Sequence, residues 1–597
     1  MGDDINRFFP YTRWRPGQRA LAEKVYDAIT SNKILLVGYP IGHGKTAATL
    51  SAALASNAKK ILYLARSKLQ FQAPIREIFL LKKRGIYVDT TVLSSKQEYC
   101  PLSFAKKFEY KEFLILCSRL RKNGKCPYTT TINKYLENII ESQPLININI
   151  ARRLARESRV CPYEIALSSL KKSRVIILSY TYLFSPLLRK VALEQHGINL
   201  EESVIIVDEA HNLPGNITES LSVKISQLTL SKARQEILNI KSAESASIAR
   251  RLSYFKTLMK DEPGEISSQV ILSLLPSSEK LYKLSSFIER DLLYVSAVRR
   301  IADLVYLLEN YGEKVITTIN IRGELIATLY DASRIAKHVF SKVKSAILLS
   351  ATMPPREYMV RMLGIPSYRH VEEVVYPYTW GSNAKVYLVT GLSSRFAERN
   401  EKTYRRYAAI IDLFHSDSGV TLVIAPSYNF AQKLYSLVKS RPLFIEKRSS
   451  SLDSIKSALI SSISEEGKAI FIAVAWGKVV EGVEFTVDNK SIISRIIITG
   501  LPIPEPSPKN RRIYATLVQQ LGNTNAAWKI VYIYPALYKI IQSIGRGIRS
   551  RKDRVEALII DDRAALYAVD YLEKYGLHPR IISIHDLVGL YLKNKSI

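Results

Sequence analysis

The chain has 597 residues, 47% of them hydrophobic, which is more than one hydrophobic core can organise, so several domains are expected. Lys and Arg number 86 against 54 Asp and Glu, and the net charge of +32 favours a nucleic-acid partner, with solvated charged surfaces as the alternative. No apolar run reaches the ~18 residues of a membrane span, and the start MGDDINRFFPY lacks signal-peptide character, so we expect a cytoplasmic protein rather than a membrane or secreted one.

A glycine-containing turn lies between a predicted buried strand and a predicted helix in KILLVGYPIGHGKTAATLSAAL, residues 33–54. In that context G-K-T is typical of a phosphate-binding loop, whose glycines admit the phosphates, whose lysine reaches the β- and γ-oxygens and whose threonine binds magnesium. The residues that we expect to hold a nucleotide here are Gly42, His43, Gly44, Lys45 and Thr46. Tyr39 stands where the usual pattern begins with glycine, which leaves a purely structural turn as the alternative.

All cysteines of the chain fall within one short stretch, residues 100–161, and none forms a C-x-x-C pair. They are Cys100, Cys117, Cys126 and Cys161. Three of them are followed by proline, as at the end of the bacterial ferredoxin cysteine run. The spacing alone leaves open an iron–sulfur cluster, a zinc site of four distant thiols, or plain buried thiols. The surrounding segment is rich in charge and poor in apolar periods, so metal cross-links would stabilise it, and its basic residues would line a DNA channel or form a solvated loop.

A second motif, SVIIVDEAHNLP, occupies residues 203–214. Its aliphatic run predicts a central parallel strand that delivers Asp208 and Glu209 at its carboxyl end. Asp208 would hold magnesium through water, and Glu209 would orient and deprotonate the water that attacks the γ-phosphate.

The middle of the chain, residues 223–311, is predicted to be mostly helical, because its apolar residues keep the three-to-four spacing of an amphipathic face. A hairpin is expected around Arg322 and Gly323. From residue 386 onward, strands such as VTLVIAPS and AIFIAVA alternate with helices, which indicates a second parallel sheet.

Near the C-terminus, QSIGRGIRS contains Gln542, Arg546 and Arg549, with the arginines three residues apart on one side of a helical turn. Such a pair can neutralise γ-phosphate charge, whereas an ordinary basic helix is the alternative. Because these arginines lie about 500 residues from the phosphate loop, we expect two domains that close on ATP.

In their order along the chain, these motifs resemble those of the XPD-type helicases, the iron–sulfur branch of superfamily 2 that also includes DinG-like proteins. Other segments carry the resemblance too: FFPYTRWRPGQ looks like the opening motif, ILYLARSKLQ like motif Ia, Ser350 to Thr352 like motif III, and GKVVEGVEF like motif V with Glu481, Gly482 and Glu484. The resemblance implies that Gln18 reads adenine, that Glu481 lies at the nucleotide, and that Arg66, Arg399 and Tyr428 lie near DNA. It also implies that the four cysteines ligate a 4Fe–4S cluster.

The implied fold is α/β, with two RecA-like parallel-sheet motor domains and two inserts in the first of them. The predicted boundaries are 1–92, 169–222 and 312–385 for motor domain 1, 93–168 for the iron–sulfur domain, 223–311 for a mainly helical arch, and 386–597 for motor domain 2.

The resemblance implies a monomeric, ATP- and Mg²⁺-dependent helicase that moves 5′ to 3′ on single-stranded DNA and unwinds forked DNA in repair. Charge density and few cysteines suggest an archaeal, heat-adapted source and a nucleoid-associated protein. Three alternatives stay open: an ATP-switched DNA-binding subunit that does not unwind, a nuclease-linked DinG-like protein, and an RNA track.

Overall fold

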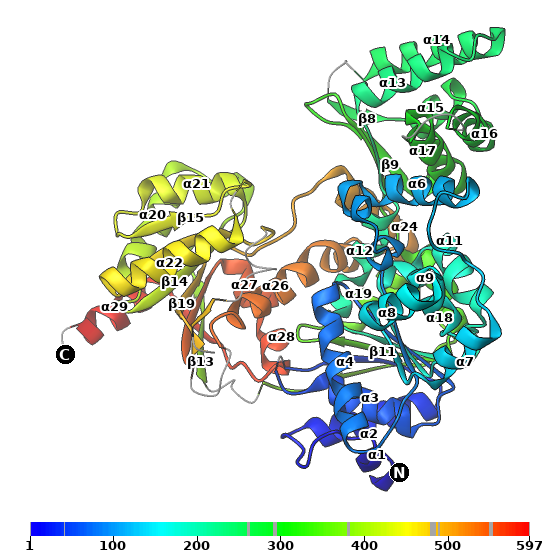
Figure 1. Ribbon diagram of the computed structural model, residues 1–597. Coiled ribbons are helices and arrows are strands. Elements are labelled where there is room, and N and C mark those ends of the chain that lie inside the picture. Colours follow the sequence, from blue (N-terminus) through cyan, green and yellow to red (C-terminus); the bar gives the residue numbers. More distant parts are fainter. Residues whose placement is uncertain are drawn as a thin grey trace.

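Two parallel β-sheets covered by helices form two lobes of the computed structural model (Figure 1). The structure describes residues 2–40, 42–259, 263–289, 295–378, 383–449, 451–477, 485–487, 490–548 and 553–595. The α/β class with two parallel-sheet domains is therefore confirmed. None of the helices in these ranges is both long and apolar enough to cross a membrane.

The first sheet has eight strands in the order β12-β1-β11-β6-β2-β5-β3-β4, all of them parallel. Its strands are β1 (Ile34–Gly38), β2 (Lys60–Ala65), β3 (Thr90–Leu93), β4 (Leu145–Ile146), β5 (Val175–Ser179), β6 (Ser203–Val207), β11 (Ser345–Ser350) and β12 (Val371–Val375). Every residue of β1, β6 and β11 is buried, as expected for central parallel strands covered on both faces. Their carboxyl ends meet at one edge, where ligands of such sheets bind.

Helices pack on both faces of this sheet. They are α1 (Gly2–Arg7), α2 (Gln18–Thr30), α3 (Lys45–Ala55), α4 (Lys68–Lys83), α10 (Tyr180–Phe184), α11 (Pro186–Leu188), α12 (Leu213–Ser220), α18 (Ser333–Lys342) and α19 (Arg356–Leu363). The first insert runs between β3 and β5 and holds α5 (Lys96–Tyr99), α6 (Tyr110–Lys122), α7 (Lys134–Ser142), α8 (Ile148–Ser158) and α9 (Pro162–Ser168).

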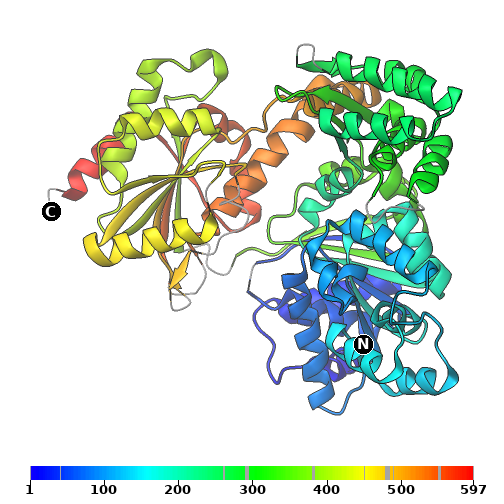
Figure 2. The same cartoon turned by 45° about the horizontal axis from the view of Figure 1, so that its top comes forward.

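The segment expected to form the arch, and called the arch below, lies above the first sheet in the view of Figure 2 and combines helices with a four-stranded antiparallel sheet, β7-β10-β9-β8. Its elements are β7 (Val223–Ile225), α13 (Gln227–Leu238), α14 (Ala243–Leu258), β8 (Gly264–Ile266), α15 (Ser268–Leu274), α16 (Ser278–Ile288), α17 (Ala297–Tyr311), β9 (Val315–Ile319) and β10 (Leu325–Leu329). The hairpin at Arg322 and Gly323 joins β9 to β10, so the arch sheet continues past residue 311, where the sequence placed its end. Two of its strands, β7 and β8, have three residues each, which is too few for a sequence pattern to reveal them.

The second sheet has seven parallel strands in the order β15-β16-β14-β19-β20-β13-β21. Its strands are β13 (Ala384–Thr390), β14 (Gly419–Ala425), β15 (Leu443–Ile445), β16 (Lys468–Val474), β19 (Ile493–Ile498), β20 (Val555–Ile560) and β21 (Arg580–Ser583). The helices of this lobe are α20 (Glu401–Phe414), α21 (Tyr428–Leu437), α22 (Leu452–Glu466), α24 (Pro508–Leu521), α25 (Thr524–Trp528), α26 (Tyr534–Ile544), α27 (Asp562–Tyr567), α28 (Val569–Lys574) and α29 (Ile584–Lys595).

Helix α24 leaves the second sheet and packs on the first lobe, although the sequence placed it in motor domain 2 (Figure 1). Ile513 and Leu517 are buried in the same core as the arch and the first insert. Lys509 donates a 2.9 Å hydrogen bond to Thr218, and Arg512 pairs with the arch residue Glu265 at 2.7 Å. Helix α24 thus lies between two strands of the second sheet in the sequence but packs against the first lobe.

Candidate functional site

The phosphate-binding loop predicted from the sequence follows β1 at the carboxyl edge of the first sheet and leads directly into α3. Gly42 and Gly44 have φ angles of 76° and 79°, in the left-handed region that glycine adopts without strain. A Cβ added at Gly44 would lie 2.3 Å from the side-chain nitrogen of Gln18, so the loop packs closely on the opening segment. The N-terminus of α3 therefore presents unpaired amides beside a loop that admits an anion.

Lys45 lies between the two carboxylates that follow β6. Its Nζ is 2.7 Å from Asp208 Oδ1 and 2.8 Å from Glu209 Oε1. Burial lowers the pKa of Lys45, but the two carboxylates outweigh burial and raise that pKa above its ordinary value, so the lysine is charged. Glu209 has a φ of 51°, a strained backbone conformation for a residue with a side chain, of the kind found at functional sites. An incoming phosphate would compete with these carboxylates for the lysine.

Oxygen donors for a magnesium ion lie beside this lysine. Thr46 is buried and its hydroxyl lies 3.4 Å from the hydroxyl of Tyr63, while Asp208 is almost fully enclosed. Within the described ranges no group of three or more His, Cys, Asp or Glu side chains is arranged to hold a metal ion. Mg²⁺ nevertheless fits this donor set, because proteins bind it through one or two side-chain oxygens and leave its other positions to phosphates and water.

The opening segment before α2 is tied to the phosphate loop by two side chains. Gln18 donates a 2.9 Å hydrogen bond to the carbonyl of Gly44 and accepts one of 3.0 Å from the amide of Arg15. The guanidinium of Arg15, which the sequence analysis did not single out, donates to the carbonyl of Gly42. Gln18 therefore holds the loop in this structure, and its predicted contact with adenine stays a prediction.

Tyr39, the departure from the usual loop pattern, is buried against Tyr376, with ring centroids 5.2 Å apart. Burial raises the pKa of its phenol to about 12. Its side chain packs in the core, and its ring stands edge-on to that of His43 in the loop, with 6.4 Å between the centroids.

A hydrogen-bonded chain crosses from the first sheet to the second lobe at His211. Its Nδ1 is 2.7 Å from the hydroxyl of Ser350, and its Nε2 is 2.9 Å from the amide nitrogen of Gln542. The same amide nitrogen donates to Thr352 at 3.2 Å, and Glu209 lies 3.5 Å from the histidine. The structure thus brings together three motifs that are far apart in sequence. His211 was visible in the sequence as the last letter of D-E-A-H, but nothing in that pattern revealed its partners.

The other predicted residues of the second lobe are only partly accounted for. Arg546 follows α26, is half-buried, and accepts a 3.1 Å hydrogen bond from Ser491 at its carbonyl. Arg549 and Glu481, together with Gly482 and Glu484, lie outside the described residues, so their roles stay predictions.

The residues predicted near DNA all follow strands at carboxyl edges of the two sheets. Arg66 is exposed after β2. Tyr428 begins α21, and the guanidinium of Arg448 lies 4.9 Å from the centre of its ring. Arg399 is instead packed within the second lobe, where it donates a 2.8 Å hydrogen bond to the carbonyl of Ser394 and burial lowers its pKa. Arg66 and Tyr428 are therefore better presented to a ligand than Arg399.

The four cysteines line one small cavity in the first insert, although they come from separate elements. Cys100 directly follows α5, Cys117 lies in α6, Cys126 follows α6 and Cys161 precedes α9. Burial raises the pKa of Cys117 to about 11 and raises those of Cys100 and Cys161. Four thiols around one cavity, with Lys96 and Arg121 beside them, are the donor type that an iron–sulfur cluster takes, although within the described ranges they are not drawn together into a metal-holding group.

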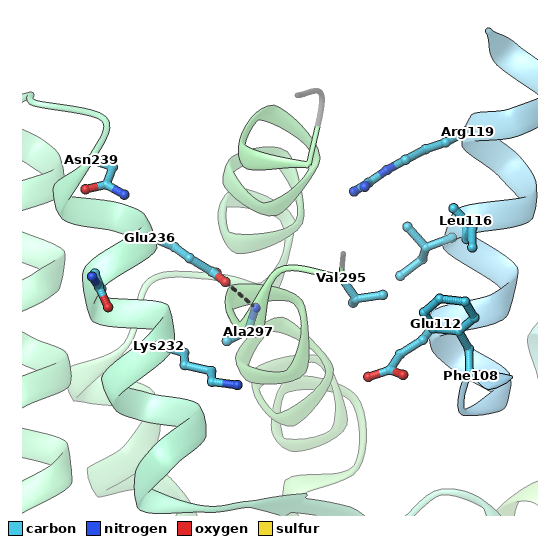
Figure 3. A pocket seen from close by; sticks show the side chains of 11 residues that line it. Phe108, Glu112, Leu116, Arg119, Lys232, Glu236, Asn239, Val295 and Ala297 are labelled. Atoms are coloured by element: carbon cyan, nitrogen blue, oxygen red, sulfur yellow. Dashed lines mark hydrogen bonds between the residues drawn. The ribbon is translucent and has the colours of Figure 1, made fainter. Parts of the chain in front are cut away.

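A larger cavity of about 470 Å³ separates the first insert from the arch (Figure 3). Its walls come from α6 on one side and from α13 and the start of α17 on the other. Glu236 caps α17 by accepting a 3.2 Å hydrogen bond from the amide of Ala297, whereas Arg119 projects from α6. Because both inserts line this one cavity, they lie next to each other.

Comparisons with known proteins agree with this arrangement. The family model DEAD_2 matches residues 63–230, and the model of the Helicase C-terminal domain matches residues 410–571. The chain is 26% identical over 559 residues to the ATP-dependent DNA helicase XPD of Sulfolobus acidocaldarius, across 92% of this chain and 96% of that one.

More distant relatives are a Regulator of telomere elongation helicase 1 homolog of Drosophila erecta, at 22% identity, and the ATP-dependent DNA helicase CHL1 of Candida glabrata, at 23%. Each alignment covers 84% of this chain, with 61% of the first relative and 69% of the second. A solved structure named XPD_Helicase has a TM-score of 0.69 and 23% identity, and covers 96% of this chain and 100% of its own. Another, from S. tokodaii and named Xpd4, has a TM-score of 0.63 and 17% identity, covering 95% of this chain and 100% of its own. These solved structures share the fold.

Proposed function

The chain belongs to the XPD-type branch of the superfamily 2 helicases, and on this basis we propose that it is an ATP-dependent DNA helicase that moves 5′ to 3′ on single-stranded DNA and acts in repair. The observation that carries the proposal is the chain of contacts from Lys45 and Glu209 through His211 to Gln542, because it links a phosphate-binding edge of one sheet to the other lobe.

Binding of ATP would begin at the phosphate loop. Amides of the loop and of the start of α3 would hold the β- and γ-phosphates, and Lys45 would exchange its carboxylate partners for phosphate oxygens. Thr46 and Asp208 would hold Mg²⁺, which when bound neutralises phosphate charge. Glu209, released from the lysine, would then face the attacking water.

In the hydrolysis step, the water oxygen would attack the γ-phosphorus while Glu209 takes its proton. The bond from the γ-phosphorus to the bridging oxygen would break, and that oxygen would leave on ADP. Gln542, Arg546 and Arg549 would stabilise charge from the second lobe, and Glu481 would lie at the nucleotide. Loss of the γ-phosphate would weaken the contact across the lobes and allow them to move apart.

The DNA track would cross the carboxyl edges of both sheets. Arg66 would contact backbone phosphates, and Tyr428 would stack on a base, with Arg399 supporting the surface beneath. Phosphate contacts tolerate any sequence and weaken in salt, as a translocating motor requires. We propose single-stranded and forked DNA as the partners of a monomeric protein located with the nucleoid in the cytoplasm.

The first insert, residues 93–168, is proposed to be an iron–sulfur domain in which Cys100, Cys117, Cys126 and Cys161 would hold a 4Fe–4S cluster. When bound, the cluster would supply the covalent cross-links that a small, charged insert lacks. Residues 223–311 are proposed as the arch, and the remaining predicted boundaries as the two motor domains.

Strand displacement by the wild type and by Glu209→Gln tests this proposal. We expect the variant to keep nucleotide and DNA binding but to lose ATP hydrolysis and unwinding by about 100-fold or more, because the proton acceptor is gone. A wild type that binds DNA and ATP but never unwinds would support the ATP-switched subunit instead. Substrates with a 5′ or a 3′ tail, made of DNA or RNA, test polarity and track.

A further inference from the structure

Three buried tyrosines join the two lobes at the segment that follows β11. Tyr571 and Tyr575, in α28 and at its end, donate hydrogen bonds of 2.8 and 2.9 Å to the carbonyl of Met353. Tyr378, on the chain that connects the lobes, donates one of 2.7 Å to the carbonyl of Ala351. The amide of Tyr378 in turn donates to the carbonyl of Tyr575 at 2.8 Å. Two hydroxyls of the second lobe thus meet one carbonyl of the first.

This contact is closed to water. Tyr378, Tyr571 and Tyr575 are 6%, 7% and 0% exposed, and Met353 is fully buried. The ring centroids of Tyr571 and Tyr575 lie 5.4 Å apart, and those of Tyr378 and Tyr575 lie 5.5 Å apart. A carbonyl has two lone pairs, and here both receive a donor from the other lobe. Separating the lobes at this point would leave several buried polar groups unpaired, so the contact resists opening.

The contact beside the nucleotide site is different, although it involves the preceding residue. Here a single donor, the side-chain amide nitrogen of Gln542, makes the hydrogen bonds to both Thr352 and His211. Gln542 is half-buried. Water can replace a half-buried amide more easily than two enclosed hydroxyls. A hydrogen bond also weakens steeply when its length grows by a few tenths of an ångström or its angle falls. A small rotation about Met353 would therefore break the Gln542 contact and keep the tyrosine contact.

The connecting chain passes through the same place. The amide of Tyr376 donates a 2.8 Å hydrogen bond to the carbonyl of Gly38, the last residue of β1 before the phosphate loop. The two lobes are thus joined at one place by the connecting chain and by three tyrosine hydroxyls. When two lobes rotate, displacement is smallest where they are joined, so this arrangement is that of a hinge.

We infer that Tyr571 and Tyr575 form the pivot about which the lobes turn, and that they act as positioning residues for the ATP site. By holding the carbonyl of Met353 they would set the neighbouring Thr352 and Ser350, and through Ser350 the ring of His211. The inference rests on the proposed function, because it states how that helicase couples hydrolysis to movement.

The test uses full-length protein carrying Tyr571→Phe and Tyr575→Phe together, which removes both hydroxyls and keeps both rings. The matched control is Tyr407→Phe, whose hydroxyl is equally buried but donates at 3.0 Å to the carbonyl of Ile560 within the second lobe. We expect the nucleotide affinity of all variants to stay within about twofold of wild type. The double variant alone should consume about 10-fold more ATP per base pair unwound, because it loses buried hydrogen bonds that couple hydrolysis to movement. Equal ATP consumption in the double variant and the control would overturn the inference.

Hydrogen exchange supplies a second readout that does not depend on unwinding. With and without a non-hydrolysable ATP analogue, the backbone amides of residues 350–353 should keep the same protection from exchange, whereas the amides around His211 should change in protection. Loss of protection at residues 350–353 on adding the analogue would overturn the pivot. A wild type without ATPase or unwinding activity would instead remove the proposed function, so the two failures are distinguishable.

Discussion

The protein joins its parts in two physically different ways, at the pivot between the lobes and at the contact between the first insert and the arch. The pivot uses neutral, enclosed hydrogen bonds to the Met353 carbonyl. The second contact uses charges: Arg300 lies 3.2 Å from Glu109, and Arg119 lies 3.7 Å from Glu289. Short neutral hydrogen bonds in a closed core fix a geometry and do not depend on salt, whereas partly solvated ion pairs such as those of Arg300 hold weakly and are screened. The molecule therefore keeps a defined axis where ATP acts and a loosely held contact between its inserts.

The largest effect is expected when the first insert loses its proposed metal. Cys126→Ser should abolish the cluster, loosen α6 and so remove the charged contact with the arch, while the pivot stays intact. Because metal binding supplies folding energy in small domains, we expect unwinding to fall about 100-fold or more with nucleotide affinity unchanged. Iron and sulfide quantification, strand displacement and hydrogen exchange of α6 measure these changes. An iron-free wild type that still unwinds DNA would contradict the prediction.

The contact across the nucleotide site is expected to rank next. Gln542→Leu removes the hydrogen bonds to His211 and Thr352, and we expect ATP hydrolysis to fall by roughly 10- to 100-fold at constant nucleotide affinity. Steady-state kinetics and nucleotide titration separate the two effects. Gln519→Leu, at an exposed position of α24, is the matched control and should behave as wild type. Equal losses in both variants would mean that the cross-lobe contact has no part in hydrolysis.

Within the charged contact, the two arginines near Glu289 should differ in their effect on stability. Arg299 makes hydrogen bonds of 2.9 and 2.7 Å to this buried carboxylate, so Arg299→Met should destabilise the arch by about 3 kcal/mol by leaving the charge poorly paired. Among the described residues, two buried guanidinium nitrogens of Arg119 have no hydrogen-bond partner, so Arg119→Met should cost less than about 1 kcal/mol. Thermal or denaturant unfolding ranks the variants, and the opposite order would refute this account of the cavity wall.

The smallest effect is expected from salt. Arg300 is 43% exposed at its side chain, so its pairs with Glu109 and Glu112 should contribute less than about 1 kcal/mol and fade at high ionic strength. Hydrogen exchange of α6 should therefore quicken in salt, and Arg300→Ala should remove most of that dependence. Exchange of the amides of residues 350–353 should not respond to salt. A pivot that loosened in parallel with α6 would erase the difference between the two contacts.

Local pattern was a good guide wherever one element carries its own chemistry. The glycines and Lys45 predict a phosphate loop between a strand and a helix. The aliphatic run before Asp208 predicts a buried strand that ends in carboxylates. Their meeting at 2.7 Å also follows, because parallel strands deliver their carboxyl ends to one edge. The short strands of the arch, the packing of α24 on the first lobe and the role of Gln18 in holding the loop did not follow, because each depends on partners that a linear pattern does not name.

By itself, then, the sequence determined the two parallel sheets, the phosphate loop, the carboxylate pair and the collection of thiols in one insert, because periodicity and motif spacing are encoded in neighbouring residues. Only the tertiary structure decided that Gln542 meets His211, that four distant cysteines line one cavity, and that Tyr571 and Tyr575 share the carbonyl of Met353. Nothing in the local sequence distinguishes these tyrosines from other core aromatics. Their hydroxyls reach the Met353 carbonyl, more than 200 residues away, only once both lobes have folded. A buried hydroxyl needs a hydrogen-bond acceptor, and the packing of the folded chain decides which acceptor is within reach.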